Sequence, residues 1–155
     1  MNCGKDVHRP GSLVSERAPG YNRRMANRSG DWLHQAEADL EHAQSSAKDG
    51  DYEWSCFAAQ QAAEKALKAL YYSLHGDPWG HSILAMLRGL PSEAVGTPEA
   101  DLIDAAKALD KHYIQTRYPN GFDTGAPTDY YTERDARESI TLAKSILEFC
   151  RAKIR

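Results

Sequence analysis

The clearest pattern of apolar and polar positions is in residues 51–74, which contain no Gly or Pro and are rich in Ala, the best helix former. Asp51 suits an N-cap and Gly76 suits a C-terminal stop, so we predict one long helix between them. Apolar side chains cover most of its circumference, which is typical of a helix at the centre of a bundle. One face carries Cys56, Ala59, Ala63, Ala66, Leu70 and Leu74, and Trp54, Phe57, Ala58, Ala62, Leu67 and Tyr71 widen it.

Other segments with helical spacing surround this central helix. We predict helices from residue 29 or 31 to about 47, from 83 to 90, from 98 or 99 to about 117, and from 133 to the end. His81 or Ser82 is a candidate N-cap for the short helix from 83 to 90. Thr132 with Asp135 resembles a capping box at the start of the last helix. Residues 48–50, 91–97 and 118–131 are predicted loops. The pattern therefore predicts an all-α fold, an up-and-down bundle of four main helices plus one short helix, over residues 29–155.

The first 28 residues differ from the rest in composition and charge. They have no apolar period and carry a net charge of +4, which leaves −7 for residues 29–155. We predict a flexible basic extension before the bundle, with Met25 as a second possible start and a targeting peptide as the alternative interpretation. No apolar run approaches the ~18 residues of a membrane span, and the three cysteines lack zinc-site spacing. We expect a cytoplasmic protein without metal or cofactor. Because residues 29–155 are acidic, any RNA contact needs a local basic cleft.

Polar side chains interrupt the apolar surface of the central helix, and two interpretations of them stay open. The first places Gln60, Glu64, Lys65 and Lys68 on the solvent edge, with Glu64 and Lys68 spaced for an ion pair. The second has the Gln60–Gln61 pair and Glu64 partly buried and hydrogen-bonded to a neighbouring element or a second subunit.

The densest group of chemically capable residues is Asp110 to Asn120, at the end of the predicted fourth helix. Arg117 offers a planar fork for phosphate, and Tyr113 and Tyr118 offer faces for a base or ribose. Lys111 is a second positive charge, and His112 is a weak candidate general acid or base. The structural alternative is that Lys111 and Arg117 only complement the helix dipole. We interpret His81 as a capping residue rather than a ligand.

Several of these segments together resemble the HEPN domain. They are Tyr52–Leu74, Trp79-Gly80-His81-Ser82-Ile83, Leu109-Asp110-Lys111, Thr116-Arg117-Tyr118-Pro119 with the preceding Tyr113 and Ile114, and Tyr130-Tyr131-Thr132. The resemblance spans about residues 29–155. It implies a helical bundle that forms a homodimer, and residues of both subunits contribute to the site if the dimer forms through the central helix 51–74 and the helix from 98 or 99. It also implies a minimal nucleotidyltransferase partner, often as a toxin–antitoxin pair.

Many HEPN proteins resemble metal-independent ribonucleases that use an Arg-x(4–6)-His motif, and this chain departs from that motif. No His follows Arg117 at that spacing, and the pair Arg28 and His34, which has the spacing, lies outside the usual place. The chain is more similar to the branch with a TRYP segment, which implies nucleotide binding or regulation. We expect Lys111, Tyr113, Arg117 and Tyr118 to bind a nucleotide or phosphate, with His81, Gln61 and Glu64 as weaker candidates. A ribonuclease toxin using Arg117 and a nearby His such as His112, and a structural dimer without ligand, stay open as alternatives.

Overall fold

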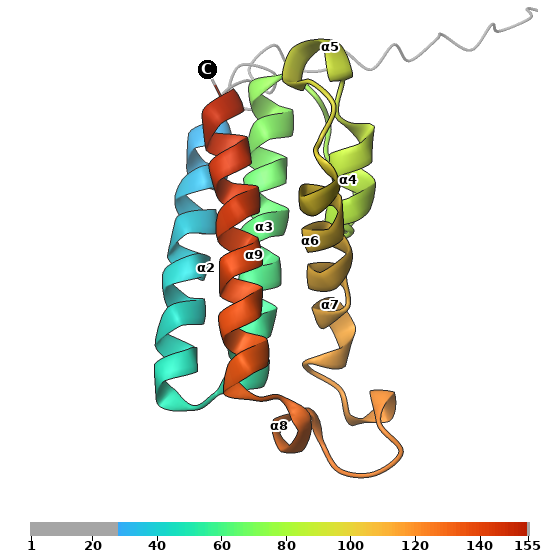
Figure 1. Cartoon of the computed structure of the whole chain (residues 1–155). Helices are drawn as coiled ribbons and strands as arrows, with labels where there is room; N and C mark the ends of the chain where they lie inside the picture. Colours follow the sequence, from blue (N-terminus) through green and yellow to red (C-terminus); the bar gives the residue numbers. More distant parts are fainter. Residues whose placement is uncertain (1–27, 155) are drawn as a thin grey trace, which may run out of the picture.

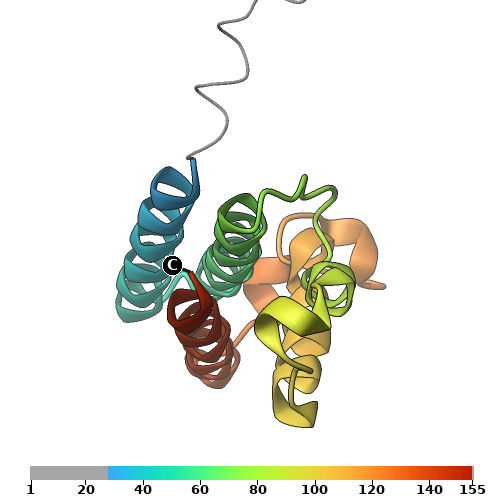
Figure 2. The ribbon, with the colours of Figure 1, turned by 90° about the horizontal axis from the view of Figure 1, so that it is seen from above.

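The computed structural model describes residues 28–154, and within that range every regular element is a helix. Three long helices lie side by side, as Figures 1 and 2 show: α2 (Ser29–Asp49), α3 (Tyr52–Ser73) and α9 (Glu133–Lys153). The fourth column of the bundle is made of shorter pieces, α4 (Ile83–Gly89), α6 (Ala100–Asp110) and α7 (His112–Gln115). The all-α bundle predicted from the sequence is confirmed.

Helix α3 is the centre of the packing, because it contacts α2 and α9 along its length and also the shorter helices α4, α6 and α7. Its small side chains Ala59, Ala62, Ala63 and Ala66 are fully buried, which lets the neighbouring helices approach closely. The larger core side chains Leu67, Leu70, Leu87, Leu109 and Ile146 fill the space between them. The predicted central position of residues 51–74 is therefore correct.

Helix α3 begins after the predicted N-cap residue, and its C-terminal end is built differently from the prediction. Asp51 is the N-cap residue but makes no capping hydrogen bond with its side chain. At the other end, the left-handed residue is His75 (φ 60°), not Gly76. Gly76 N–H donates to Tyr71 O at 2.8 Å and His75 N–H donates to Tyr72 O at 3.2 Å, which is the Schellman pattern. A side chain at position 76 would meet Tyr71, with a built Cβ only 2.9 Å from its Cδ1.

Two predicted loops contain short helical turns. Residues 91–97 include α5 (Ser92–Val95), and residues 118–131 include the 3-10 turn η1 (Pro119–Gly121) and α8 (Pro127–Tyr130). Each turn follows or begins with a proline, whose fixed φ favours the first position of a helix. The predicted helix from 98 or 99 to about 117 is interrupted at Lys111, which keeps right-handed helical dihedrals. The capping box of Thr132 and Asp135 is confirmed, with Thr132 Oγ1 accepting from Asp135 N at 3.3 Å.

Within residues 28–154, no helix is long and apolar enough to cross a membrane. Cys56 and Cys150 are both buried free thiols. The predicted basic extension, with Met25 and Cys3, lies outside the described residues except for Arg28.

Candidate functional site

Arg117 is held over aromatic rings at the end of α7. Its guanidinium carbon lies 4.5 Å from the ring centre of Phe57, 4.9 Å from that of Tyr113 and 5.3 Å from that of Tyr118. Its Nε and Nη2 both donate to Tyr113 O, at 2.9 and 2.6 Å. We call these four residues the Arg117 cluster. The cation is thus oriented by its own helix and by the side of α3.

Local sequence explains why Arg117 and Tyr118 point as they do. Arg117 lies four residues after Tyr113, so its side chain folds back over the last turn of the helix. Pro119 disfavours helical dihedrals in the residue before it. Tyr118 accordingly has extended backbone (φ −131°, ψ 131°), and its side chain is about half exposed. The chain is therefore kept out of the helical conformation at Tyr118, and its ring lies beside the guanidinium of Arg117.

Among the described residues, no carboxylate forms an ion pair with Arg117. A guanidinium has five N–H donors, and the two bonds to Tyr113 O leave donors on Nη1 and Nη2. The group therefore retains both its charge and part of its fork. Such an arrangement suits an incoming phosphate or carboxylate.

A second group of polar residues surrounds Glu64 on α3. Glu64 is 3% exposed, and its Oε1 accepts from Lys68 Nζ at 2.8 Å and from His81 Nδ1 at 3.1 Å. Its Oε2 accepts from the amides of Gln60 and Gln61, both at 3.3 Å. We call these five residues the Glu64 network. The solvent-edge interpretation is wrong for Gln60, which is fully buried, and for Glu64, because both bind the segment that precedes α4.

His81 joins the Glu64 network to the Arg117 cluster. Its ring stacks on Tyr113 with centroids 4.7 Å apart and planes 17° apart. Its carbonyl accepts from Gln60 Nε2 at 3.2 Å. Of the two predicted candidates, Ser82 caps α4 by accepting from Ala85 N at 3.1 Å, and the interpretation of His81 as a capping residue is wrong. His81 instead stands between the two groups with its side chain 55% exposed.

Asp110 fixes the segment that carries His81. Its carboxylate accepts from Ser82 Oγ at 2.8 Å and from the backbone N–H groups of Ile83 (2.7 Å) and Leu84 (3.1 Å). These N–H groups are at the start of α4, where they have no partner within the helix and where a negative charge is also favoured by the helix dipole. Sequence reasoning did not assign Asp110, Phe57, Gln60 or Lys68 to the site. The polar group 110–120 contained Asp110, and the helical spacing paired Lys68 with Glu64 and placed Gln60 beside it, whereas Phe57 had no signal besides its position in a resembling segment.

Lys111 is exposed, and no hydrogen bond or ion pair of the described residues joins it to the Arg117 cluster or the Glu64 network. The structure therefore brings together Tyr113, Arg117, Tyr118, His81, Gln61 and Glu64 of the predicted site residues. Lys111 and His112 are not part of this assembly.

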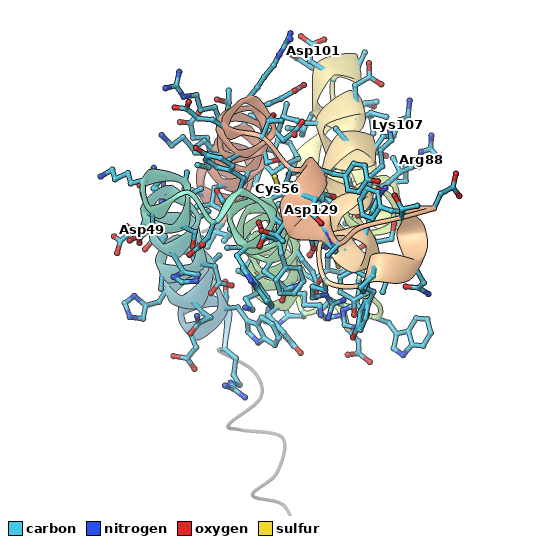
Figure 3. All side chains as sticks on the ribbon, turned by 90° about the horizontal axis from the view of Figure 1, so that it is seen from below. Asp49, Cys56, Arg88, Asp101, Lys107 and Asp129 are labelled. Carbon is cyan, nitrogen blue, oxygen red and sulfur yellow. The ribbon has the colours of Figure 1, made fainter. Side chains whose placement is uncertain are left out.

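His112 belongs to a separate polar chain between α3, α7 and α9. Its Nδ1 lies 3.2 Å from Tyr131 Oη, its Nε2 lies 3.1 Å from Ser139 Oγ, and Ser139 Oγ donates to Cys56 Sγ at 3.4 Å. Figure 3 shows Cys56 in the interior of the bundle, where burial raises the pKa of its thiol to about 11. Burial lowers the pKa of His112, against the raising effect of Asp135 and Glu138. Both ring nitrogens are occupied within the protein, which favours a structural role over catalysis.

A hollow of about 680 Å³ lies elsewhere, between residues 95–102 and α9. Its apolar walls include Leu102, Leu142 and Phe149, and no predicted site residue lines it. Among the described residues, no group of three or more His, Cys, Asp or Glu side chains is placed to hold a metal ion. The chemically capable residues therefore gather at the Arg117 cluster and the Glu64 network.

The structure defines an all-α domain in which the Arg117 cluster lies beside the buried Glu64 network. The family model described as "HEPN domain" matches residues 29–153, and the chain belongs to this family. The resemblance seen in the sequence is thereby confirmed.

Solved structures of related proteins have the same fold. TT1696 from Thermus thermophilus is 50% identical, with a TM-score of 0.79, over 82% of this chain and 98% of that one. ST0689, described as an archaeal HEPN homologue, is 43% identical with a TM-score of 0.70, over 83% and 98% of the two chains. Among curated proteins, "Putative toxin MJ1304" of Methanocaldococcus jannaschii is 29% identical over 137 residues, which cover 83% of this chain and 88% of the relative.

Proposed function

We propose that this HEPN protein is a nucleotide-binding regulatory module in which Arg117 takes the phosphate of the ligand. The observation that carries the proposal is the setting of Arg117. Its guanidinium is oriented by Tyr113 O and three aromatic rings, and no carboxylate of the described residues neutralises it. A charged fork held in place in advance costs little entropy to bind a phosphate.

The aromatic residues around Arg117 supply the second part of a nucleotide site. Tyr118 and Trp54 are each about half exposed, and Trp54 meets the edge of Phe57 with centroids 6.1 Å apart. Stacking of a base on such a ring contributes ~1–3 kcal/mol per base and suits any base. Tyr113 has a different part in this proposal, because His81 and Arg117 both contact its ring. It supports those two side chains rather than a base.

The test is a thermal-shift panel with ribonucleotides, read as the rise in melting temperature that each nucleotide causes. At a hundredfold excess over Kd, binding adds ~2.7 kcal/mol to stability, a rise of several degrees for a domain of this size. We expect this rise in the parent and in Arg151→Ala, which removes an arginine that pairs with Glu37. We expect no rise in Arg117→Ala. Equal shifts in Arg117→Ala and the parent would contradict the assignment.

We further propose that the protein acts as a cytoplasmic homodimer with a minimal nucleotidyltransferase partner, in a toxin–antitoxin type of pair. Membership of the HEPN family and the name of the relative MJ1304 support this. Ile114, 53% exposed on α7, offers apolar surface for the second copy. The dimer is tested by light scattering, which measures the molecular mass in solution, on the parent and on Ile114→Asp. The partner is tested by co-expressing this protein with a nucleotidyltransferase encoded beside its gene and purifying the two together. Failure of the two proteins to co-purify would count against the pairing.

A second candidate function is a metal-independent ribonuclease toxin. Two observations favour it: the name of MJ1304, and the contact of both His81 and Arg117 with Tyr113, which puts an Arg and a His near each other despite the absent motif. The purified protein would be incubated with total tRNA in EDTA beside Arg117→Ala and His81→Ala. Cleavage by the parent that both variants lose supports this function. Cleavage that persists in either variant removes that residue from the active site, and no cleavage by the parent rejects the function.

A further inference from the structure

The Glu64 network determines which nitrogen of His81 carries a hydrogen. Glu64 Oε1 is a carboxylate oxygen that also binds Lys68 Nζ at 2.8 Å, and a carboxylate in this pair can only accept. His81 Nδ1, 3.1 Å from the same oxygen, must therefore be the N–H donor. In the neutral tautomer that carries this Nδ1–H, Nε2 is unprotonated and is a hydrogen-bond acceptor.

That acceptor is available to a ligand. The side chain of His81 is 55% exposed, and within residues 28–154 no protein group forms a hydrogen bond with its Nε2. The ring is held by its stacking on Tyr113 and by the bond of Nδ1 to Glu64 Oε1, and the backbone of His81 is held by Gln60. The adjoining Ser82 is held by Asp110. His81 thus presents a fixed acceptor at the surface.

The position of this acceptor relative to Arg117 restricts the ligand. The ring of His81 lies 4.7 Å from the Tyr113 ring centre and the guanidinium of Arg117 lies 4.9 Å from it. The two groups are therefore less than about 10 Å apart. A single ligand that binds both groups must carry an anionic group and, within one ribose–phosphate unit of it, a hydroxyl that donates a hydrogen bond.

We infer that the Arg117 site selects ribonucleotides over deoxyribonucleotides, with His81 Nε2 accepting a hydrogen bond from the ribose 2′-hydroxyl while Arg117 binds the phosphate. The 2′-hydroxyl is the group by which a protein tells RNA from DNA. Glu64 is a positioning residue in this arrangement, because it acts only through the orientation and hydrogen placement of His81. The inference rests on the proposed function, since it assigns the class of nucleotide that the site takes.

The experiment measures Kd by isothermal titration calorimetry for ribonucleoside 5′- and 3′-monophosphates and their 2′-deoxy counterparts. The proteins are the parent, His81→Phe and Arg117→Ala, each as the full chain. Phe keeps the stacking on Tyr113 but has no acceptor, so it is the matched control for shape. One hydrogen bond corresponds to about a three- to tenfold preference for the ribo form in the parent. In His81→Phe the preference should fall to about one, with deoxynucleotide affinity retained.

The outcomes separate this inference from the proposed function. If the parent binds the ribo and deoxy forms equally well, among both the 5′- and the 3′-monophosphates, the inference is overturned and nucleotide binding at Arg117 remains intact. A ribo preference that survives in His81→Phe also overturns it, because another group then reads the hydroxyl. If Arg117→Ala still binds both forms, the assignment of the phosphate site is overturned. If the parent binds neither form, the proposed function itself is overturned.

Discussion

Replacing Glu64 by Gln should destabilise this protein far more than replacing an exposed glutamate in a comparable ion pair. The Glu64 side chain is 4% exposed and that of its partner Lys68 is 13% exposed. Gln has the same shape but no charge, so Lys68 loses its counter-ion in a largely buried place. Breaking a buried pair costs ~3–5 kcal/mol. We expect ~2–3 kcal/mol here, because the Gln carbonyl still accepts a hydrogen bond and Lys68 can move toward water.

The matched control is Glu133→Gln on the first turn of α9. Glu133 pairs with Arg137, also four residues later, but these side chains are 56% and 74% exposed. Such pairs contribute ~0–1 kcal/mol. Urea unfolding followed by circular dichroism, at one fixed protein concentration, gives the comparison. The free energy of unfolding falls by ~1–3 kcal/mol per M urea in small proteins. The urea concentration at the midpoint should therefore fall by ~1–2 M for Glu64→Gln and by only a few tenths of this amount for Glu133→Gln.

A double variant tests the reason as well as the size of the effect. Lys68→Met combined with Glu64→Gln removes both charges, so no unpaired ion remains buried. The double variant should therefore be more stable than Glu64→Gln alone by ~1 kcal/mol or more. The reasoning is refuted if Glu64→Gln unfolds at the same midpoint as Glu133→Gln. It is also refuted if Lys68→Met adds to the loss instead of reducing it.

Three further predictions concern other parts of the molecule. Because burial lowers the pKa of His112, the unfolded chain binds more protons as pH falls below ~6.5, so stability is full above that pH and decreases below it. His112→Gln should flatten this part of a curve of melting temperature against pH, and an unchanged slope would contradict the buried state of the ring. His75→Gly should raise stability by up to ~1 kcal/mol, measured in urea, because an L-residue at φ 60° is strained; a loss would show that the ring of His75 makes a stabilising contact. Gly89→Ala should lower stability by ~1 kcal/mol or more, since a Cβ there lies 2.6 Å from Tyr71 Oη and disturbs its bond to Met86 O, whereas Gly30→Ala, with open space around it, should not.

The helices could be predicted from the sequence because their signals are local. The Ala-rich segment 51–74, the apolar stripe of the last helix and the Thr132–Asp135 capping box each depend on residues within a few turns of one another. Hydrophobic period and caps act over that range, so they are readable without the fold. The interruption of the fourth helix at Lys111 was missed, because the residue keeps helical dihedrals and only the hydrogen-bond ladder breaks.

Several members of the site were also found from residue type and spacing. Arg117 lies four residues after Tyr113, just past the end of α7, so their contact follows from the helical repeat of this last turn. Tyr118 before Pro119 is forced into extended backbone, which the sequence alone predicts. His112 has the chemistry of a candidate but is occupied at both ring nitrogens by Tyr131 and Ser139, residues 19 and 27 positions away.

The assembly of the site was decided by contacts between residues distant in sequence. The sequence left open whether Glu64 is solvated or buried, because charge spacing on a helix is the same in both cases. Packing of α4 and α7 against α3 decided it: His81, 17 residues from Glu64, closes over the carboxylate and stacks on Tyr113. Asp110, 28 residues from Ser82, fixes the segment that carries His81. The sequence by itself thus determined the helices and the place of Arg117, whereas only the tertiary structure decided which side chains surround it, because a buried charge is stable only where distant donors meet it.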